Sequence, residues 1–201
     1  MERLSSPFSK VPALSLSKGD KKGILKVNSK MKISVRKYRD CDYDVCRSLY
    51  GEMALYHAEI YEDPSIAGDD PGRGFDVYIA RADRCGSWVA VSDGKIIGFA
   101  GLLDTVGEEG VAEVEPVVVS VDSRGEGIGS KLIRHVIKEA RKKGFRFLTI
   151  RPELRNEEAF SLYVRLGFNL AGHIELFQDL SPTSERKWKP GIVIHGNELK
   201  Y

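Results

Sequence analysis

One short stretch, VVVSVDSRGEGIG at residues 117–129, constrains the fold of this chain more than any other. Its β-branched first half is typical of a strand, and the residues after Gly127 place apolar side chains at helical spacing. The apolar positions of that helix are Ile128, Leu132, Ile133, Val136, Ile137 and Ala140. Glycines between the two elements permit a tight strand-to-helix turn. The stretch therefore predicts a mixed α/β domain.

Other elements are predicted on both sides of this turn. Residues 42–60 have helical spacing, and a second helix is expected to begin after Asn156, a typical N-cap, and to end at Gly167. The predicted strands are residues 31–38, 87–91, 96–103, 111–121, 145–150, 173–180 and 191–196. Pro116 interrupts the fourth of these strands, because a proline cannot donate to a sheet ladder. Residues 62–74, rich in Pro, Gly and Asp, are predicted to be a loop.

Length and composition favour one globular domain with tails. The chain has 201 residues, of which 42% are hydrophobic, and a net charge of +2, so its charge gives no argument for a nucleic-acid or membrane partner. Residues 1–30 lack periodicity and are predicted to be a flexible extension, with Met31 as a candidate natural start. Residues 181–201 are expected to add a last strand that completes the sheet.

The cysteines and histidines do not follow a metal-binding pattern. Three cysteines, Cys41, Cys46 and Cys85, cannot all pair with each other, and the four histidines lie far apart in the sequence. This usage favours reduced thiols in a cytoplasmic protein and no metal site.

The glycine turn at residues 124–129 has the character of an anion site. A helix N-terminus presents unpaired N–H groups, and glycines allow a ligand to approach the backbone closely. The string GxxxxGK[ST] of a Walker loop is absent, and Ser130 stands at the third glycine of a dinucleotide turn. A phosphate site, a different nucleotide site and a plain structural turn all remain open on these residues alone.

Two motifs together resemble the GNAT family of N-acetyltransferases, and in particular its compact archaeal and bacterial members. RGEGIG at residues 124–129 matches Q/R-x-x-G-x-G/A, and NEEAFSLYVRLGF at residues 156–168 matches the family's second motif. Val121 and Ser123 depart from residues that are common in the family. The resemblance implies a GNAT domain over residues 31–180. Its fold would be a central mixed, mostly antiparallel β-sheet, flanked by helices and with a splayed strand pair.

The resemblance also implies acetyl-CoA as co-substrate and a set of binding residues. The pantetheine arm would pair with the strand at residues 117–119, and the pyrophosphate would lie on the N–H groups of residues 124–130. The implied binding residues are Val117, Val118, Val119, Arg124, Gly125, Glu126, Gly127, Ile128, Gly129, Ser130, Asn156 and Tyr163. Asn156 is equally well explained as a helix N-cap.

Two residues are candidates for catalysis. Tyr163 stands where the family often has the general acid for the leaving thiolate, although its helical position also fits a core tyrosine. Glu115 is the candidate base, and Glu113 lies two residues earlier on the same strand. Arg151 occupies the position at which some members that act on protein N-termini carry a glutamate.

The expected activity is acetyl-CoA-dependent N-acetyl transfer to a primary amine by direct attack in a ternary complex. The acceptor would be a small amine, a peptide N-terminus or a lysine, and the alternative is a non-catalytic acyl-CoA-binding sensor. An acidic run, Glu59, Glu62, Asp63, Asp69 and Asp70, is either an attractive patch for a cationic amine or a solvated loop. A homodimer is a further expectation.

Overall fold

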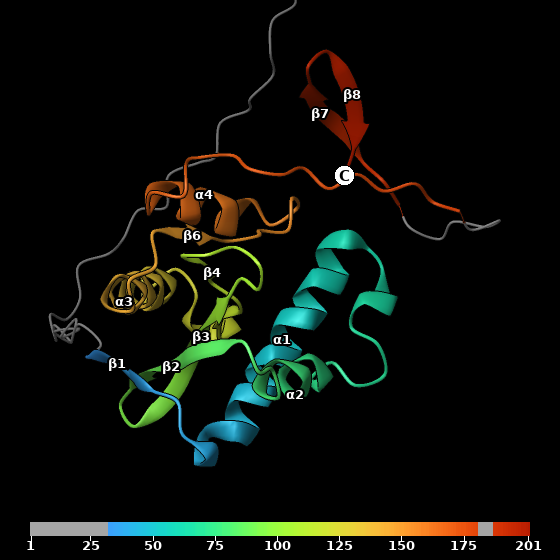
Figure 1. The fold of residues 1–201 in the computed structure, drawn as a ribbon. Helices are drawn as coiled ribbons and strands as arrows, with labels where there is room; N and C mark the ends of the chain where they lie inside the picture. The colour runs from blue at the N-terminus through green and yellow to red at the C-terminus, as the bar shows by residue number, and fades with distance from the viewer. Residues whose placement is uncertain (1–31, 181–186) are drawn as a thin grey trace, which may run out of the picture. The chain divides into compact units, whose positions relative to one another are not determined.

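The computed structural model describes residues 32–180 and 187–201, so the predicted extension at residues 1–30 lies outside the described residues. A six-stranded sheet forms the centre of the domain (Figure 1). Its strands are β1 (Ile33–Lys37), β2 (Arg84–Ser92), β3 (Lys95–Asp104), β4 (Val111–Glu113), β5 (Val117–Val119) and β6 (Phe147–Thr149). The order is β1-β2-β3-β4-β6, with β5 paired to β3, and only β4 and β6 run parallel.

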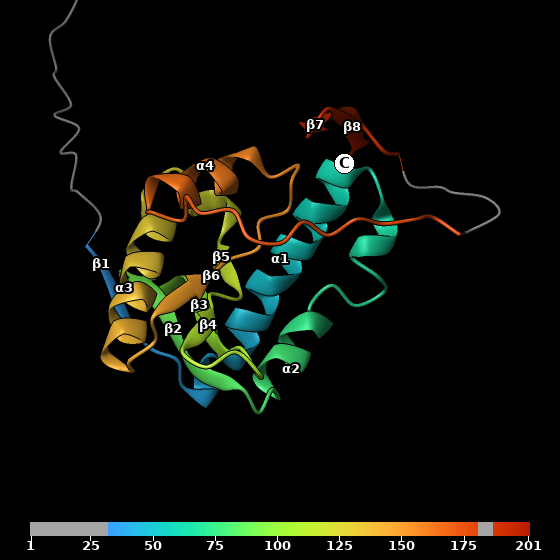
Figure 2. The same cartoon turned by 45° about the horizontal axis from the view of Figure 1, so that its top comes forward.

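Helices cover both faces of this sheet (Figure 2). The helices are α1 (Tyr43–Tyr61), α2 (Arg73–Ile79), α3 (Ile128–Lys142) and α4 (Glu157–Arg165). Phe99 and Leu103 of β3 pack with buried residues of α1 and α2, whereas Ala100 and Leu102 pack with the apolar stripe of α3. This alternation follows from the two-residue period of a strand, which sends successive side chains to opposite faces. The predicted mixed α/β fold is confirmed.

The hairpin between β2 and β3 forms where the Asp-Gly turn predicted it. Asp93 and Gly94 both have positive φ, 47° and 79°, as a two-residue turn of this hand requires. The helix predicted from Ile128 also begins at that residue and ends one residue before Lys143.

The strand predicted over residues 111–121 is divided at Pro116 into β4 and β5. Across this break Gly101 of β3 donates its N–H to the Pro116 carbonyl at 2.9 Å and accepts from the Glu115 N–H at 3.2 Å. On the other side, β6 pairs with β4, and the last bond of that pairing runs from the Val114 N–H to the Thr149 carbonyl. Among the described residues, the edge of β5 that faces away from β3 therefore has no strand partner. The strands β5 and β6 form the expected splayed pair.

Three expectations about individual elements are wrong. Residues 173–180 form no strand, although their sequence alternates as one would. The strands β7 (Pro190–Ile194) and β8 (Asn197–Lys200) pair with each other in a separate two-stranded sheet and do not complete the main one. The helix α2 begins inside the predicted loop, because Phe75 and Tyr78 bury their rings against α1 and the sheet.

No helix in residues 32–180 and 187–201 has both the length and the apolar character needed to cross a membrane.

Candidate active site

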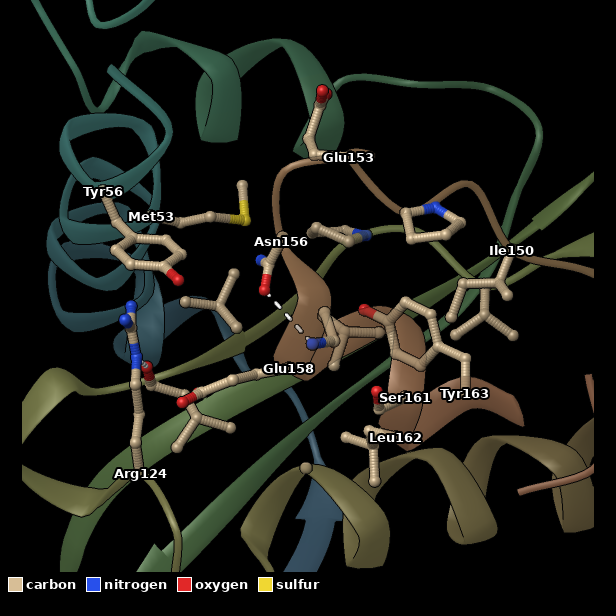
Figure 3. A pocket seen from close by; sticks show the side chains of 18 of the residues that line it. Met53, Tyr56, Arg124, Ile150, Glu153, Asn156, Glu158, Ser161, Leu162 and Tyr163 are labelled. Carbon is tan, nitrogen blue, oxygen red and sulfur yellow. Dashed lines mark hydrogen bonds between the residues drawn. The ribbon is translucent and has the colours of Figure 1, made fainter. Parts of the chain in front are cut away.

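A cavity of about 1010 Å³ opens where β5 separates from β6. Its walls are β5, the glycine turn before α3, the loop at residues 150–156 with α4, and one face of α1 (Figure 3). Eleven of the predicted site residues line it: Glu115, Val117, Val118, Val119, Arg124, Gly125, Gly127, Gly129, Ser130, Asn156 and Tyr163. Glu126 is exposed and Ile128 is buried in the core, so only their backbone groups could serve a ligand.

The glycine turn exposes backbone to this cavity. Gly125 and Gly127 both have a φ of 79°, a conformation that favours glycine, and Gly127 is the N-cap of α3. A Cβ at either position would meet no heavy atom within 4 Å, so open space lies directly over the turn. The unpaired N–H groups of the first turn of α3 and the positive end of its helix dipole would favour an anion at this turn.

Arg124 adds a cation at the mouth of the cavity. Its guanidinium lies over the Tyr56 ring of α1, 4.3 Å from the ring centroid, and its Nε is 3.5 Å from the Val119 carbonyl oxygen (Figure 3). This stacking holds the charge between α1 and the glycine turn. The sequence predicted the cation but gave no sign of its aromatic partner, which is 68 positions earlier in the chain.

Asn156 and Tyr163 approach the cavity from the opposite wall. The Asn156 side-chain oxygen accepts a hydrogen bond from the Ala159 N–H at 3.1 Å, which confirms the N-cap and leaves the side-chain amide free to donate (Figure 3). Tyr163 is half-buried with its hydroxyl directed into the cavity, and burial raises its pKa to about 12. The phenol therefore stays protonated throughout the neutral range.

Carboxylates gather at the β4 end of the cavity. Glu115 is exposed to the cavity, while Glu113 is buried and lies with its Oε1 3.4 Å from the Nε of Arg151. Burial raises the pKa of Glu113 above its ordinary value, and Arg151 opposes that shift. Tyr50 of α1 lines the same end, and its pKa is raised by burial and by the nearby charge of Glu115.

The acidic run of the sequence is not part of this cavity. None of Glu59, Glu62, Asp63, Asp69 and Asp70 lines it. Asp70 pairs with Arg47, and Glu62 pairs with Lys187 at 3.0 Å and with Lys189 at 3.4 Å. These ion pairs neutralise part of the run and favour the alternative of a solvated loop.

Sequence reasoning missed the residues that α1 brings to the cavity, Tyr50, Met53, Tyr56 and His57. Their spacing of three and four residues marks one helix face, but the helical pattern of residues 42–60 gave no sign that this face lines a cavity. Burial lowers the pKa of His57, so this imidazole is neutral at neutral pH.

In the described part of the chain, no three His, Cys, Asp or Glu side chains gather as a metal site would require.

Comparison with known proteins agrees with this geometry. The model of the acetyltransferase (GNAT) family matches residues 50–168. The L-amino acid N-acyltransferase MnaT of Escherichia coli is 30% identical over 140 residues, which cover 68% of this chain and 79% of that protein. An uncharacterized N-acetyltransferase of Methanocaldococcus jannaschii is 33% identical over 95 residues, 45% of this chain and 42% of that protein. The match thus spans less than half of this second relative's length.

A solved structure is similar over the same region. The GNAT acetyltransferase of Brucella melitensis, in complex with acetyl-CoA, superposes with a TM-score of 0.51 at 27% identity, covering 64% of this chain and 80% of that one. The family match spans more than half of the chain and includes both sequence motifs and the splayed strands. The chain belongs to the GNAT family and contains its N-acetyltransferase domain.

Proposed function

We propose that this protein transfers the acetyl group of acetyl-CoA to a primary amine by direct attack in a ternary complex. One observation carries the proposal: the unpaired edge of β5, the glycine turn and Tyr163 all line a single cavity. The E. coli relative's name specifies L-amino acids, which supports a small amine as the acceptor. Peptide N-termini and lysine side chains are the other acceptors that the sequence suggested.

The cavity residues fit acetyl-CoA. The free edge of β5 offers backbone partners to the amide groups of the pantetheine arm, as an added strand would use them. The N–H groups of Gly125 to Ser130 and the Arg124 guanidinium suit the pyrophosphate. The B. melitensis structure, which holds acetyl-CoA, supports this assignment.

The reaction requires a proton acceptor for the amine and a proton donor for the thiolate. The amine nitrogen forms a bond to the carbonyl carbon as the carbon–sulfur bond breaks. Glu115, directly or through a water molecule, takes the proton that the amine loses. Tyr163 gives its proton to the departing sulfur, since its pKa of about 12 keeps it protonated and directed into the cavity. A backbone N–H of Val117 or Val119 polarises the carbonyl oxygen.

The alternative is a module that binds acyl-CoA without turnover. The arrangement of Tyr163 and Glu115 on the same cavity favours the enzyme, because a sensor requires neither an acid nor a base. We also place the protein in the cytoplasm, supported by three cysteines that are all free in the structure. The homodimer stays a prediction, which sedimentation would test.

Calorimetry with acetyl-CoA, NADH and ATP tests the cavity assignment, and thiol release with a panel of amines tests the chemistry. Of these three ligands, we expect only acetyl-CoA to bind, with a micromolar or lower Kd. We expect thiol release to require an amine. Binding of acetyl-CoA without release for any amine would favour the sensor. A preference for NADH or ATP would refute the acetyltransferase assignment.

A further inference from the structure

We propose that the acceptor is an amine that carries its own carboxylate, as a free α-amino acid does, and that Arg151 binds that carboxylate. The inference rests on the proposed function and deepens it by naming the acceptor class. It also assigns a role to an exposed arginine that lines the cavity.

Among the described residues, Arg151 forms an ion pair through one nitrogen, while its two terminal nitrogens are unpaired. It follows β6 and lines the cavity, and its Nε lies 3.4 Å from Oε1 of Glu113. The side chain of Glu113 is only 11% exposed, whereas that of Arg151 is 77% exposed. In residues 32–180 and 187–201, neither terminal nitrogen of Arg151 has a recorded partner. An exposed guanidinium whose terminal nitrogens are unpaired is suited to bind a carboxylate through two parallel hydrogen bonds.

Glu115 supplies the opposite charge at the same end of the cavity. Within the described part of the chain it makes no recorded ion pair, and its side chain is exposed to the cavity. Glu113, which pairs with Arg151, and Glu115 are two residues apart at the end of β4, and all three side chains line the cavity. The cavity thus presents a cation and an anion at the same end, which complements an ammonium and a carboxylate on one small molecule.

This charge pattern disfavours the other acceptors. The glutamates of the cavity would attract the ammonium groups of a polyamine or a protein lysine, but such an acceptor has no carboxylate for Arg151 and would leave its guanidinium unpaired. A peptide N-terminus has an amide where a free amino acid has a carboxylate. Acetyl-CoA has no need of Arg151, because its pyrophosphate is assigned to the glycine turn, beyond the far end of β5.

The test compares matched acceptors on the wild-type protein. Thiol release is measured with free L-amino acids, with the corresponding amino-acid amides and with the corresponding decarboxylated amines. We expect kcat/KM to be about 10- to 100-fold higher for the free acids, the range of a charge-assisted hydrogen-bonding pair. The amide has the less basic amine and is the easier nucleophile to deprotonate, so a preference for the acid must come from the site.

Variants then locate the preference. Arg151→Leu is expected to remove the advantage of the free acid, chiefly through KM, while the decarboxylated amine loses little. Arg151→Lys retains the charge beside Glu113 and is expected to keep part of the advantage. Arg146→Leu is the control, because Arg146 is an exposed arginine at the opposite end of β6 and does not line the cavity.

A binding measurement makes the result independent of turnover. Calorimetry with the CoA-loaded protein compares an N-acetyl amino acid with the corresponding N-acetyl amine, and we expect the former to bind more tightly. Equal or weaker binding of the N-acetyl amino acid, absence of binding by both, or a higher kcat/KM for amides and amines would overturn the inference. If thiol release occurs only with amines that lack a carboxylate, the proposed function stands and the inference about Arg151 fails. Failure to bind acetyl-CoA would refute the proposed function and the inference together.

Discussion

Two glycines at opposite ends of α3 allow the ligand role of the turn to be separated from its structural role. Gly127 precedes the helix with a φ of 79°, and Gly144 follows it with a φ of 86°. A Cβ at either position meets no heavy atom within 4 Å. Only Gly127 lines the cavity. Gly127→Ala and Gly144→Ala should therefore strain the backbone equally, but only Gly127→Ala adds a methyl group to the cavity.

Both variants should lose similar stability. A left-handed conformation costs a residue with a Cβ roughly 1–2 kcal/mol. Replacing glycine also restricts the unfolded chain, which stabilises the folded state by about 0.4–1 kcal/mol. We therefore expect each variant to lower the free energy of unfolding by about 1 kcal/mol, measured by urea denaturation with an unchanged slope.

The affinity for acetyl-CoA should separate the two variants. The alanine methyl group at position 127 projects into the space where the pyrophosphate is assigned, so we expect its Kd to rise at least tenfold, or about 1.4 kcal/mol. Gly144→Ala should bind within a factor of two of wild type. Calorimetry well below the melting temperature gives both constants. Equal Kd values in the two variants would refute the assignment of the turn to the pyrophosphate.

Three further changes probe the site and the fold. Tyr163→Phe should lower kcat about 100-fold without changing the Kd of acetyl-CoA, and because the pKa is about 12, the wild-type rate should not fall from pH 8 to 10 through loss of this proton. Asp42 is 4% exposed and accepts from both terminal nitrogens of Arg36, so Asp42→Ala should cost about 1–3 kcal/mol in urea denaturation. Arg36 lowers the pKa of this carboxyl, so its contribution is present above its usual pKa and should disappear as the pH falls through the lowered value. Gly101→Ala places a Cβ in steric conflict with the Glu115 carbonyl oxygen and should reduce both stability and acetyl-CoA binding.

The features that were predicted correctly from the sequence are those determined by residues close together in the chain. The Asp-Gly hairpin turn, the N-cap at Asn156 and the start of α3 at Ile128 all depend on residues within a few positions of each other. The glycine turn belongs to the same class, since its positive φ angles are a property of Gly125 and Gly127 themselves.

Long-range partners could not be predicted in this way. Tyr56 reaches Arg124 and Tyr50 reaches the end of β4 only because α1 packs across the sheet. The alternation of residues 173–180 predicted a strand, but a strand also needs a neighbouring edge, and in the described structure none pairs with this segment.

The opening of the sheet at β5 depends on a pair of residues that the sequence shows only separately. Pro116 predicted a break in the strand at residues 111–121, but a proline alone does not determine from which neighbouring strand the chain separates. Gly101 decides this, because its lack of a Cβ lets β3 approach close enough to exchange two hydrogen bonds with Glu115 and Pro116 across the break. The chain therefore stays attached to β3 and parts from β6. The cavity follows from that choice, since the edge of β5 that faces it is the one that β6 leaves.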